Sequence, residues 1–176
     1  MRIGIDIDDT ITNTSLKMLE YMDKLGIEQN GDDYCNYTVE DLDKYKDLLR
    51  KYIEPVLSTC TLKRDCVKVI NKLKEMGNSI YIITARSNRY SDNIYDITKK
   101  YLEDYKISYD ELFVDYEDKR DICIEQKIDY MIDDNIDVYN SLVGTNTKPI
   151  LFGKEATKSY DCIRVNNWDE ILDLIK

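Results

Sequence analysis

The side chains best suited to chemistry near the start of the chain are three aspartates that follow an apolar stretch. Residues 2–12 read Arg-Ile-Gly-Ile-Asp-Ile-Asp-Asp-Thr-Ile-Thr, so Asp6, Asp8 and Asp9 come where a β-branched strand should end. In an extended backbone the side chains of Asp6 and Asp8 leave on the same side, so one carboxylate can attack while its neighbour handles a proton. Carboxylates this close repel one another unless a cation lies among them.

Further reactive side chains follow later strands. Thr84 comes directly after the apolar residues 79–83, Asp133 and Asp134 follow residues 129–132, and Lys119 stands at the start of an expected helix. Ligands of open α/β sheets bind beyond the carboxyl ends of the strands, so we expect these groups to converge. Oxygen ligands favour Mg2+, which takes one or two carboxylates, and Asp6 with Asp133 or Asp134 meets that demand.

Each of these patterns alone has an ordinary structural explanation. An Asp-x-Asp pair is usually a turn or a cap, a threonine after a strand is usually a turn residue, and a lysine at a helix start is usually solvated. The joint placement of the residues is what predicts a phosphatase site.

Composition restricts the chemistry and the partners. The chain of 176 residues contains no histidine, which excludes Ser-His and Cys-His catalysis and leaves proton transfer to carboxylates, Lys, Tyr or a metal-bound water. Its 5 cysteines are scattered, which argues against a disulfide framework or a zinc site and predicts reduced thiols in the cytoplasm. A net charge of −10 argues against extended nucleic-acid binding. We see no signal peptide and no apolar run long enough to span a membrane.

The periodicity predicts a parallel α/β sheet. Helical patterns alternate with strands along the chain, and Ser91 and Asn167 are expected to cap two of the helices. The expected strands are a first one that ends near Ile7 and further ones over Ser79–Ile83, Leu112–Val114, Asp129–Ile132, Pro149–Phe152 and Cys162–Val165. Such alternation is typical of a Rossmann-like sheet with helices on both faces.

The segment after the first strand differs in composition from the rest of the chain. A helix over Ser15–Leu25, with Leu16, Leu19, Met22 and Leu25 on one face, precedes a polar, acidic and Tyr-rich stretch that is too long for a simple loop. We expect a turn at Asn30-Gly31, one or two short helices over Val39–Tyr52 and another that begins near Pro55. Residues 15–60 are therefore predicted to form a small helical cap, and residues 1–14 and 61–176 the core domain.

These motifs resemble those of the haloacid dehalogenase-like (HAD) phosphatases. Asp6-Ile7-Asp8-Asp9-Thr10 after a strand resembles the first signature of that superfamily, Thr84 the second, Lys119 the third and Asp133-Asp134 the fourth, in the same order. Within the superfamily, a finer pattern is similar to the 5′(3′)-deoxyribonucleotidases and related bacterial nucleotidases. It consists of Thr84-Ala85-Arg86, Thr98 with Leu102, Tyr109-Asp110-Glu111-Leu112, Lys119 and Ile132-Asp133-Asp134.

The resemblance implies a role for each motif residue. Asp6 would be the nucleophile that forms an aspartyl-phosphate, and Asp8 would protonate the leaving oxygen, activate the water and bind the metal through its backbone carbonyl. Thr84 and Lys119 would hold the phosphoryl oxygens. Asp133 or Asp134 would complete the Mg2+ shell, and we favour Asp134 as the direct ligand.

Residues that recognise the rest of the substrate are harder to predict. Arg86 and Arg89 lie in the loop after the second strand, and either is expected to reach a substrate phosphate or sugar, with surface solvation as the equal alternative. Aromatic rings of the predicted cap could stack on a nucleobase or simply pack the cap; they are Tyr21, Tyr34, Tyr37, Tyr45 and Tyr52.

The expected function is that of a Mg2+-dependent phosphomonoesterase acting on a small phosphorylated compound, with a (deoxy)nucleoside monophosphate as the favoured substrate. One alternative is a phosphatase for another small metabolite. Another is a phosphatase for polynucleotide 3′-ends, which would require a basic trough. A non-enzymatic alternative is a phospho-accepting receiver domain, although such domains have no cap and carry the acceptor aspartate after the third strand.

Overall fold

The computed structural model describes residues 1–30, 38–39, 41–153 and 162–175, and its centre is a six-stranded sheet. In spatial order, the strands are β5 (Glu111–Phe113), β4 (Ser79–Ile83), β1 (Arg2–Ile5), β6 (Tyr130–Asp133), β7 (Lys148–Phe152) and β8 (Arg164–Val165). All five pairings are parallel, so the carboxyl ends of all the strands meet at one edge. The predicted parallel α/β sheet is confirmed.

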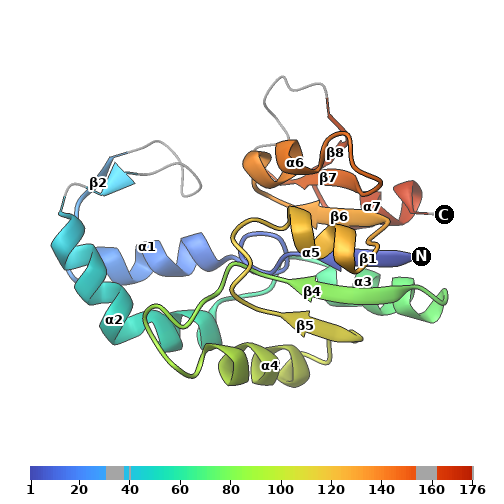
Figure 1. Ribbon diagram of the computed structural model, residues 1–176. Coiled ribbons are helices and arrows are strands. Elements are labelled where there is room, and N and C mark those ends of the chain that lie inside the picture. Colours follow the sequence, from blue (N-terminus) through green and yellow to red (C-terminus); the bar gives the residue numbers. More distant parts are fainter. Residues whose placement is uncertain (31–37, 40, 154–161, 176) are drawn as a thin grey trace.

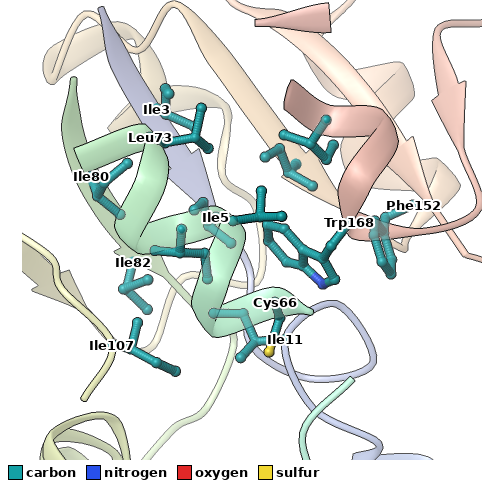
Figure 2. Close-up of a cluster of buried hydrophobic side chains, with 14 of the residues drawn as sticks. Ile3, Ile5, Ile11, Cys66, Leu73, Ile80, Ile82, Ile107, Phe152 and Trp168 are labelled. Carbon is teal, nitrogen blue, oxygen red and sulfur yellow. The ribbon is translucent and has the colours of Figure 1, made fainter. Parts of the chain in front are cut away.

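Helices cover both faces of this sheet (Figure 1). On one face lie α3 (Cys66–Glu75), α4 (Ile94–Asp104) and α7 (Trp168–Leu174), and on the other α5 (Arg120–Glu125) and α6 (Ile136–Leu142). The residues of β4 alternate between the two layers, because Ile80 and Ile82 enter the first and Tyr81 and Ile83 the second. Figure 2 shows the larger layer, in which Trp168 packs among aliphatic side chains from β1, β4 and α3.

Two further helices lie beyond the carboxyl end of β1, at the left of Figure 1. They are α1 (Thr14–Lys24) and α2 (Leu42–Thr59), with the antiparallel ribbon of β2 (Gln29–Asn30) and β3 (Thr38–Val39) between them in sequence. They pack on each other through a cluster of their own, which includes Met18, Met22, Leu48 and Val56. The division of the chain into a core and a 15–60 cap remains a prediction.

The structure corrects the predicted inner face of α1. Of the four predicted residues, Met22 is buried and Leu19 packs against the cluster with α2, but Leu16 and Leu25 are 46% and 41% exposed, and Met18 is buried although it was not predicted to be. The helix carries apolar residues on more than one side, and only the position of α2 decides which side is covered.

The structure also corrects α2 and the start of α4. A single helix of 18 residues replaces the predicted short helices, and Pro55 lies inside it. The Pro55 carbonyl accepts a hydrogen bond from Thr59 Oγ1 at 2.6 Å. Ser91, the expected cap of α4, precedes the actual N-cap Asn93 and bonds to Glu54 of α2 instead, with 2.5 Å between its Oγ and Oε1.

Two further sequence expectations concern a turn and the lack of a membrane-spanning segment. The predicted turn at Asn30-Gly31 extends outside the described residues, because Gly31 is not among them. Within the described part of the chain, no helix has both the length and the apolar character needed to cross a bilayer.

Candidate active site

The loop after β1 fixes Asp6 at the carboxyl edge of the sheet. The Asp6 N–H donates to the carbonyl oxygen of Ile132 at 3.0 Å, so the pairing of β1 with β6 continues into the aspartate. The chain then turns tightly, with Asp9 at φ 57° and the Ile11 N–H bonded to the Ile7 carbonyl at 2.9 Å. The Asp6 side chain is consequently held in a buried position, while the chain leaves toward α1.

Lys119 joins the ends of β1 and β6. Its buried ammonium donates to Asp6 Oδ1 and to Asp133 Oδ2, with 2.5 Å between the atoms in each pair. Lys119 directly precedes α5, so the predicted third motif lies against the first and the fourth. Among the described residues, no donor contacts the second carboxylate oxygen of Asp6, which leaves this atom available for attack on an electrophile.

The two neighbouring aspartates at the end of β6 have different surroundings. Both oxygens of Asp133 are occupied, since Oδ2 accepts from Lys119 and Oδ1 accepts from the Asn135 N–H at 2.9 Å. Among the residues that the structure describes, only Thr10 contacts the Asp134 carboxylate, with its Oγ1 a long 3.4 Å from Oδ1. Its carboxylate therefore retains free lone pairs.

Burial and mutual repulsion raise the pKa values of two of these acids. Burial raises the pKa of Asp6 to about 7, Lys119 opposes the shift, and the charges of Asp133 and Asp8 add to it. For Asp134, burial and then the charges of Asp6 and Asp133 raise the pKa well above its usual value. Burial disfavours the charged form of Lys119, but the two carboxylates outweigh this effect and raise its pKa. The site thus has an excess of negative charge.

Thr84 lies at the end of β4, beside this cluster. It is fully buried, its N–H donates to the Phe113 carbonyl at 2.9 Å, and its own carbonyl accepts from the Tyr116 N–H at 3.0 Å. These bonds tie the loop after β4 to the loop after β5. The Thr84 hydroxyl oxygen accepts the Arg86 N–H at 3.2 Å, which orients the hydroxyl group.

The guanidinium of Arg86 is bound to Asp8. Nε lies 3.1 and 3.0 Å from Oδ1 and Oδ2, and Nη2 lies 2.8 Å from Oδ1. The Thr14 hydroxyl donates to the same Oδ1 at 2.6 Å. Burial alone would raise the pKa of Asp8, but Arg86 and then Thr14 lower it below its usual value. Arg86 therefore already binds a protein carboxylate. The sequence pattern predicts a contact between this side chain and the substrate instead.

The structure brings the predicted residues together in two contact groups. Lys119 with Asp6 and Asp133 forms one group, whose two carboxylates repel the charge of Asp134, and Arg86 with Asp8 forms the other. Among the described residues, no three His, Cys, Asp or Glu side chains are arranged to hold a metal ion. The predicted ligand set needs no such trio, because it combines two aspartate side chains with a backbone carbonyl and water.

Three supporting residues were missed in the sequence. Thr14 contacts Asp8, Thr10 Oγ1 contacts Asp134, and the buried Trp168 donates its indole N–H to the Thr10 carbonyl at 3.0 Å. The last contact joins residues 158 positions apart, and no sequence pattern signals it.

Three of the five tyrosines named for the predicted cap are among the described residues, and these three pack on or against the α1–α2 cluster. Tyr21 and Tyr52 pack on each other with 5.3 Å between ring centroids, at the edge of the α1–α2 cluster. Tyr45 also packs against this cluster. Tyr34 and Tyr37 lie outside the described residues.

The chain matches a family model over its whole length, residues 1–176. The description of that family is "5' nucleotidase, deoxy (Pyrimidine), cytosolic type C protein". A nucleotidase of Clostridium acetobutylicum is 28% identical over 184 residues, which cover 99% of this chain and 93% of that protein.

Solved structures are similar in fold. A haloacid dehalogenase-like hydrolase of Streptococcus pneumoniae has a TM-score of 0.71 at 13% identity, covering 99% of this chain and 98% of its own. The D,D-heptose 1,7-bisphosphate phosphatase of B. bronchiseptica, solved with magnesium and phosphate, has a TM-score of 0.60 at 10% identity, covering 99% and 97%. At these identities the likeness shows a shared fold.

Proposed function

Because this chain belongs to the family of cytosolic type C 5′ (deoxy, pyrimidine) nucleotidases, it is a phosphoric monoester hydrolase of the HAD superfamily, and we propose a specific reaction for it. The reaction is the Mg2+-dependent hydrolysis of (deoxy)nucleoside 5′-monophosphates through an aspartyl-phosphate on Asp6. The observation that carries this proposal is the buried Asp6 carboxylate, held through one oxygen by Lys119 at the carboxyl edge of the sheet.

The proposed reaction has two steps. In the first, the free oxygen of Asp6 attacks phosphorus and the bond from phosphorus to the 5′-oxygen breaks. Asp8, which takes up a proton from solvent once the negative charge of the bound phosphate raises its pKa, gives that proton to the 5′-oxygen. In the second, Asp8 takes a proton from water, the water attacks phosphorus, and Asp6 departs as a carboxylate with release of phosphate. Thr84 and Lys119 donate hydrogen bonds to the phosphoryl oxygens, on which charge develops.

The side chains present fit a divalent cation. Four aspartates (Asp6, Asp8, Asp133 and Asp134) share two cations (Lys119 and Arg86), so the protein groups carry two uncompensated negative charges when all four aspartates are ionised, and a phosphate dianion would add to them. We propose that Asp6, Asp134 and the Asp8 carbonyl hold Mg2+, with Asp133 acting through water because its oxygens are occupied. When bound, the ion supplies positive charge to the transferring phosphoryl group.

The family supports a small nucleotide as substrate, and the position of α1 and α2 supports the proposal that residues 15–60 form a cap over it. The net charge of −10 argues against the alternative of polynucleotide 3′-ends, while another small phosphorylated metabolite remains the second candidate. Membership of a nucleotidase family argues against the receiver-domain alternative. We place the reaction in the cytoplasm, in keeping with the free thiols of the four described cysteines.

A substrate panel tests the proposal. We expect phosphate release from deoxy- and ribonucleoside 5′-monophosphates with Mg2+ and none with chelator, at kcat/KM values above those for sugar phosphates and for 3′-phosphorylated oligonucleotides. A preference for sugar phosphates would support the second candidate, and the absence of metal-dependent turnover on every compound would refute the proposal.

A further inference from the structure

The Arg86 side chain is almost completely enclosed. Only 2% of it is exposed, compared with 31% for the Asp8 side chain that it binds. Of this pair, Asp8 can therefore meet a substrate atom, whereas the guanidinium lies behind it.

The guanidinium is also held from the side opposite Asp8. Its Nη1 atom lies 3.4 Å from Oγ1 of Thr98, a fully buried residue of α4, and its Cζ atom lies 6.0 Å from the ring centroid of Tyr101 one turn later. The Tyr101 hydroxyl in turn donates to the Cys60 carbonyl at 2.8 Å. Helix α4 thus holds the guanidinium of Arg86 in a fixed position.

The backbone of Arg86 is fixed as well. Its N–H donates to Thr84 Oγ1 at 3.2 Å, and its carbonyl accepts the Asp115 N–H at 2.7 Å. A side chain that is held at both ends loses little freedom when it binds Asp8, and a bidentate arginine–carboxylate pair defines the orientation of the carboxylate.

We propose that Arg86 is a positioning residue that holds the Asp8 carboxyl group in place for proton transfer to the leaving oxygen, and is not a ligand of the substrate phosphate. This inference rests on the proposed function, in which Asp8 carries that proton. It reassigns one of the two arginines that the sequence analysis expects to reach the substrate, the other being Arg89, whose side chain is 67% exposed. It leaves Lys119 as the protein cation that contacts the phosphoryl group.

The two roles predict different dependence on the leaving group. A nucleoside 5′-oxygen needs a proton as it departs, whereas p-nitrophenol is acidic enough to leave as its anion. The ratio kcat/KM reports only the steps through the first irreversible one, here the release of the leaving group. A misplaced Asp8 therefore lowers kcat/KM for the nucleotide and not for p-nitrophenyl phosphate, while loss of a phosphate ligand lowers both.

The experiment compares Arg86→Lys with the wild-type protein on a deoxynucleoside 5′-monophosphate and on p-nitrophenyl phosphate, with Mg2+. We expect kcat/KM to fall about 100-fold for the nucleotide and less than about 5-fold for p-nitrophenyl phosphate, because general acid catalysis contributes on the order of 100-fold or more. The inhibition constant of inorganic phosphate should stay the same, since a phosphate ligand has not been removed.

Two further variants keep the test decisive. Thr98→Val removes the hydrogen-bond partner behind the guanidinium without touching Asp8, and should show the same substrate discrimination at smaller size even if Arg86→Lys folds poorly. Arg64→Lys, at a side chain that is 96% exposed, should match the wild type.

Equal losses on both substrates, a raised inhibition constant for phosphate, or no loss in either Arg86→Lys or Thr98→Val would overturn the inference. A wild-type protein without Mg2+-dependent turnover would instead refute the proposed function, so the two failures are distinguishable.

Discussion

The Nζ atom of Lys119 lies 2.5 Å from Oδ1 of Asp6, and both side chains are almost fully buried. The ammonium thereby holds one oxygen of the proposed nucleophile and leaves the other free. Because the same ammonium binds Asp133, one cation serves carboxylates from two neighbouring strands.

Lys119→Met should lower kcat for a deoxynucleoside monophosphate by about 100-fold or more, the loss typical of removing a donor to a developing oxyanion. It should also destabilise the metal-free protein by about 3–5 kcal/mol, because two buried carboxylates lose their partner. Steady-state kinetics and urea unfolding measure the two effects. Lys99→Met, at a half-exposed position of α4, is the matched control, and a Lys119 variant with wild-type kcat would contradict the assignment.

Asp134→Asn should stabilise the metal-free protein at high pH. The folded pKa of Asp134 lies well above the unfolded value, so ionising this group costs stability as the pH rises from about 4 through the folded pKa, and asparagine removes that cost. In EDTA we expect the variant's Tm to exceed that of the wild type by about 3 °C or more at pH 8, and by less at pH 5.

Addition of Mg2+ should reverse the order of the two proteins, because only the wild type retains the proposed ligand. Asp43→Asn, whose side chain is 96% exposed, should behave as the wild type does under all of these conditions. Equal Mg2+-induced Tm shifts in the wild type and Asp134→Asn would remove Asp134 from the metal site.

Trp168→Phe should weaken the loop that carries the first motif. The change removes the indole N–H from the buried Thr10 carbonyl and leaves a small cavity, at a combined cost of about 2–4 kcal/mol. Because Thr10 also contacts Asp134, we expect weaker activation by Mg2+ besides the loss in unfolding free energy. A change in unfolding free energy alone, with the Mg2+ dependence of the rate unaltered, would show that Trp168 supports only the core.

Ser91→Ala should test whether α2 is held over the site. The variant removes the bond from the loop after β4 to Glu54. If this bond positions the proposed cap, KM for a nucleotide should rise by about 3-fold, as expected for the loss of roughly one hydrogen bond, while KM for p-nitrophenyl phosphate stays constant. Glu54→Gln gives a second test of the same contact. Parallel changes for both substrates would argue against a cap role.

The sequence was sufficient to predict the sheet and the meeting of the motifs. Parallel strands end at one edge, so the residues that follow them, Asp6 and Asp133, had to come close once the strands were recognised. The partner of Arg86 could not be predicted, because Asp8 is 78 positions away and the contact depends on side-chain orientation. The buried face of α1 was predicted only in part: Leu19 and Met22 pack on the cluster with α2, but Leu16 and Leu25 are exposed and Met18 is buried, because the helix shows apolar residues on several sides and only its packing on α2 selects among them.

Trapping the phosphorylated enzyme shows directly whether Asp6 is the nucleophile. Protein mixed with a 32P-labelled deoxynucleoside monophosphate and Mg2+ is quenched in acid within one turnover, digested and mapped by mass spectrometry. We predict label and the mass of one phosphoryl group on the peptide that contains Asp6, and neither label nor turnover in Asp6→Asn. Label on another residue, or full turnover by Asp6→Asn, would show that Asp6 does not receive the phosphoryl group.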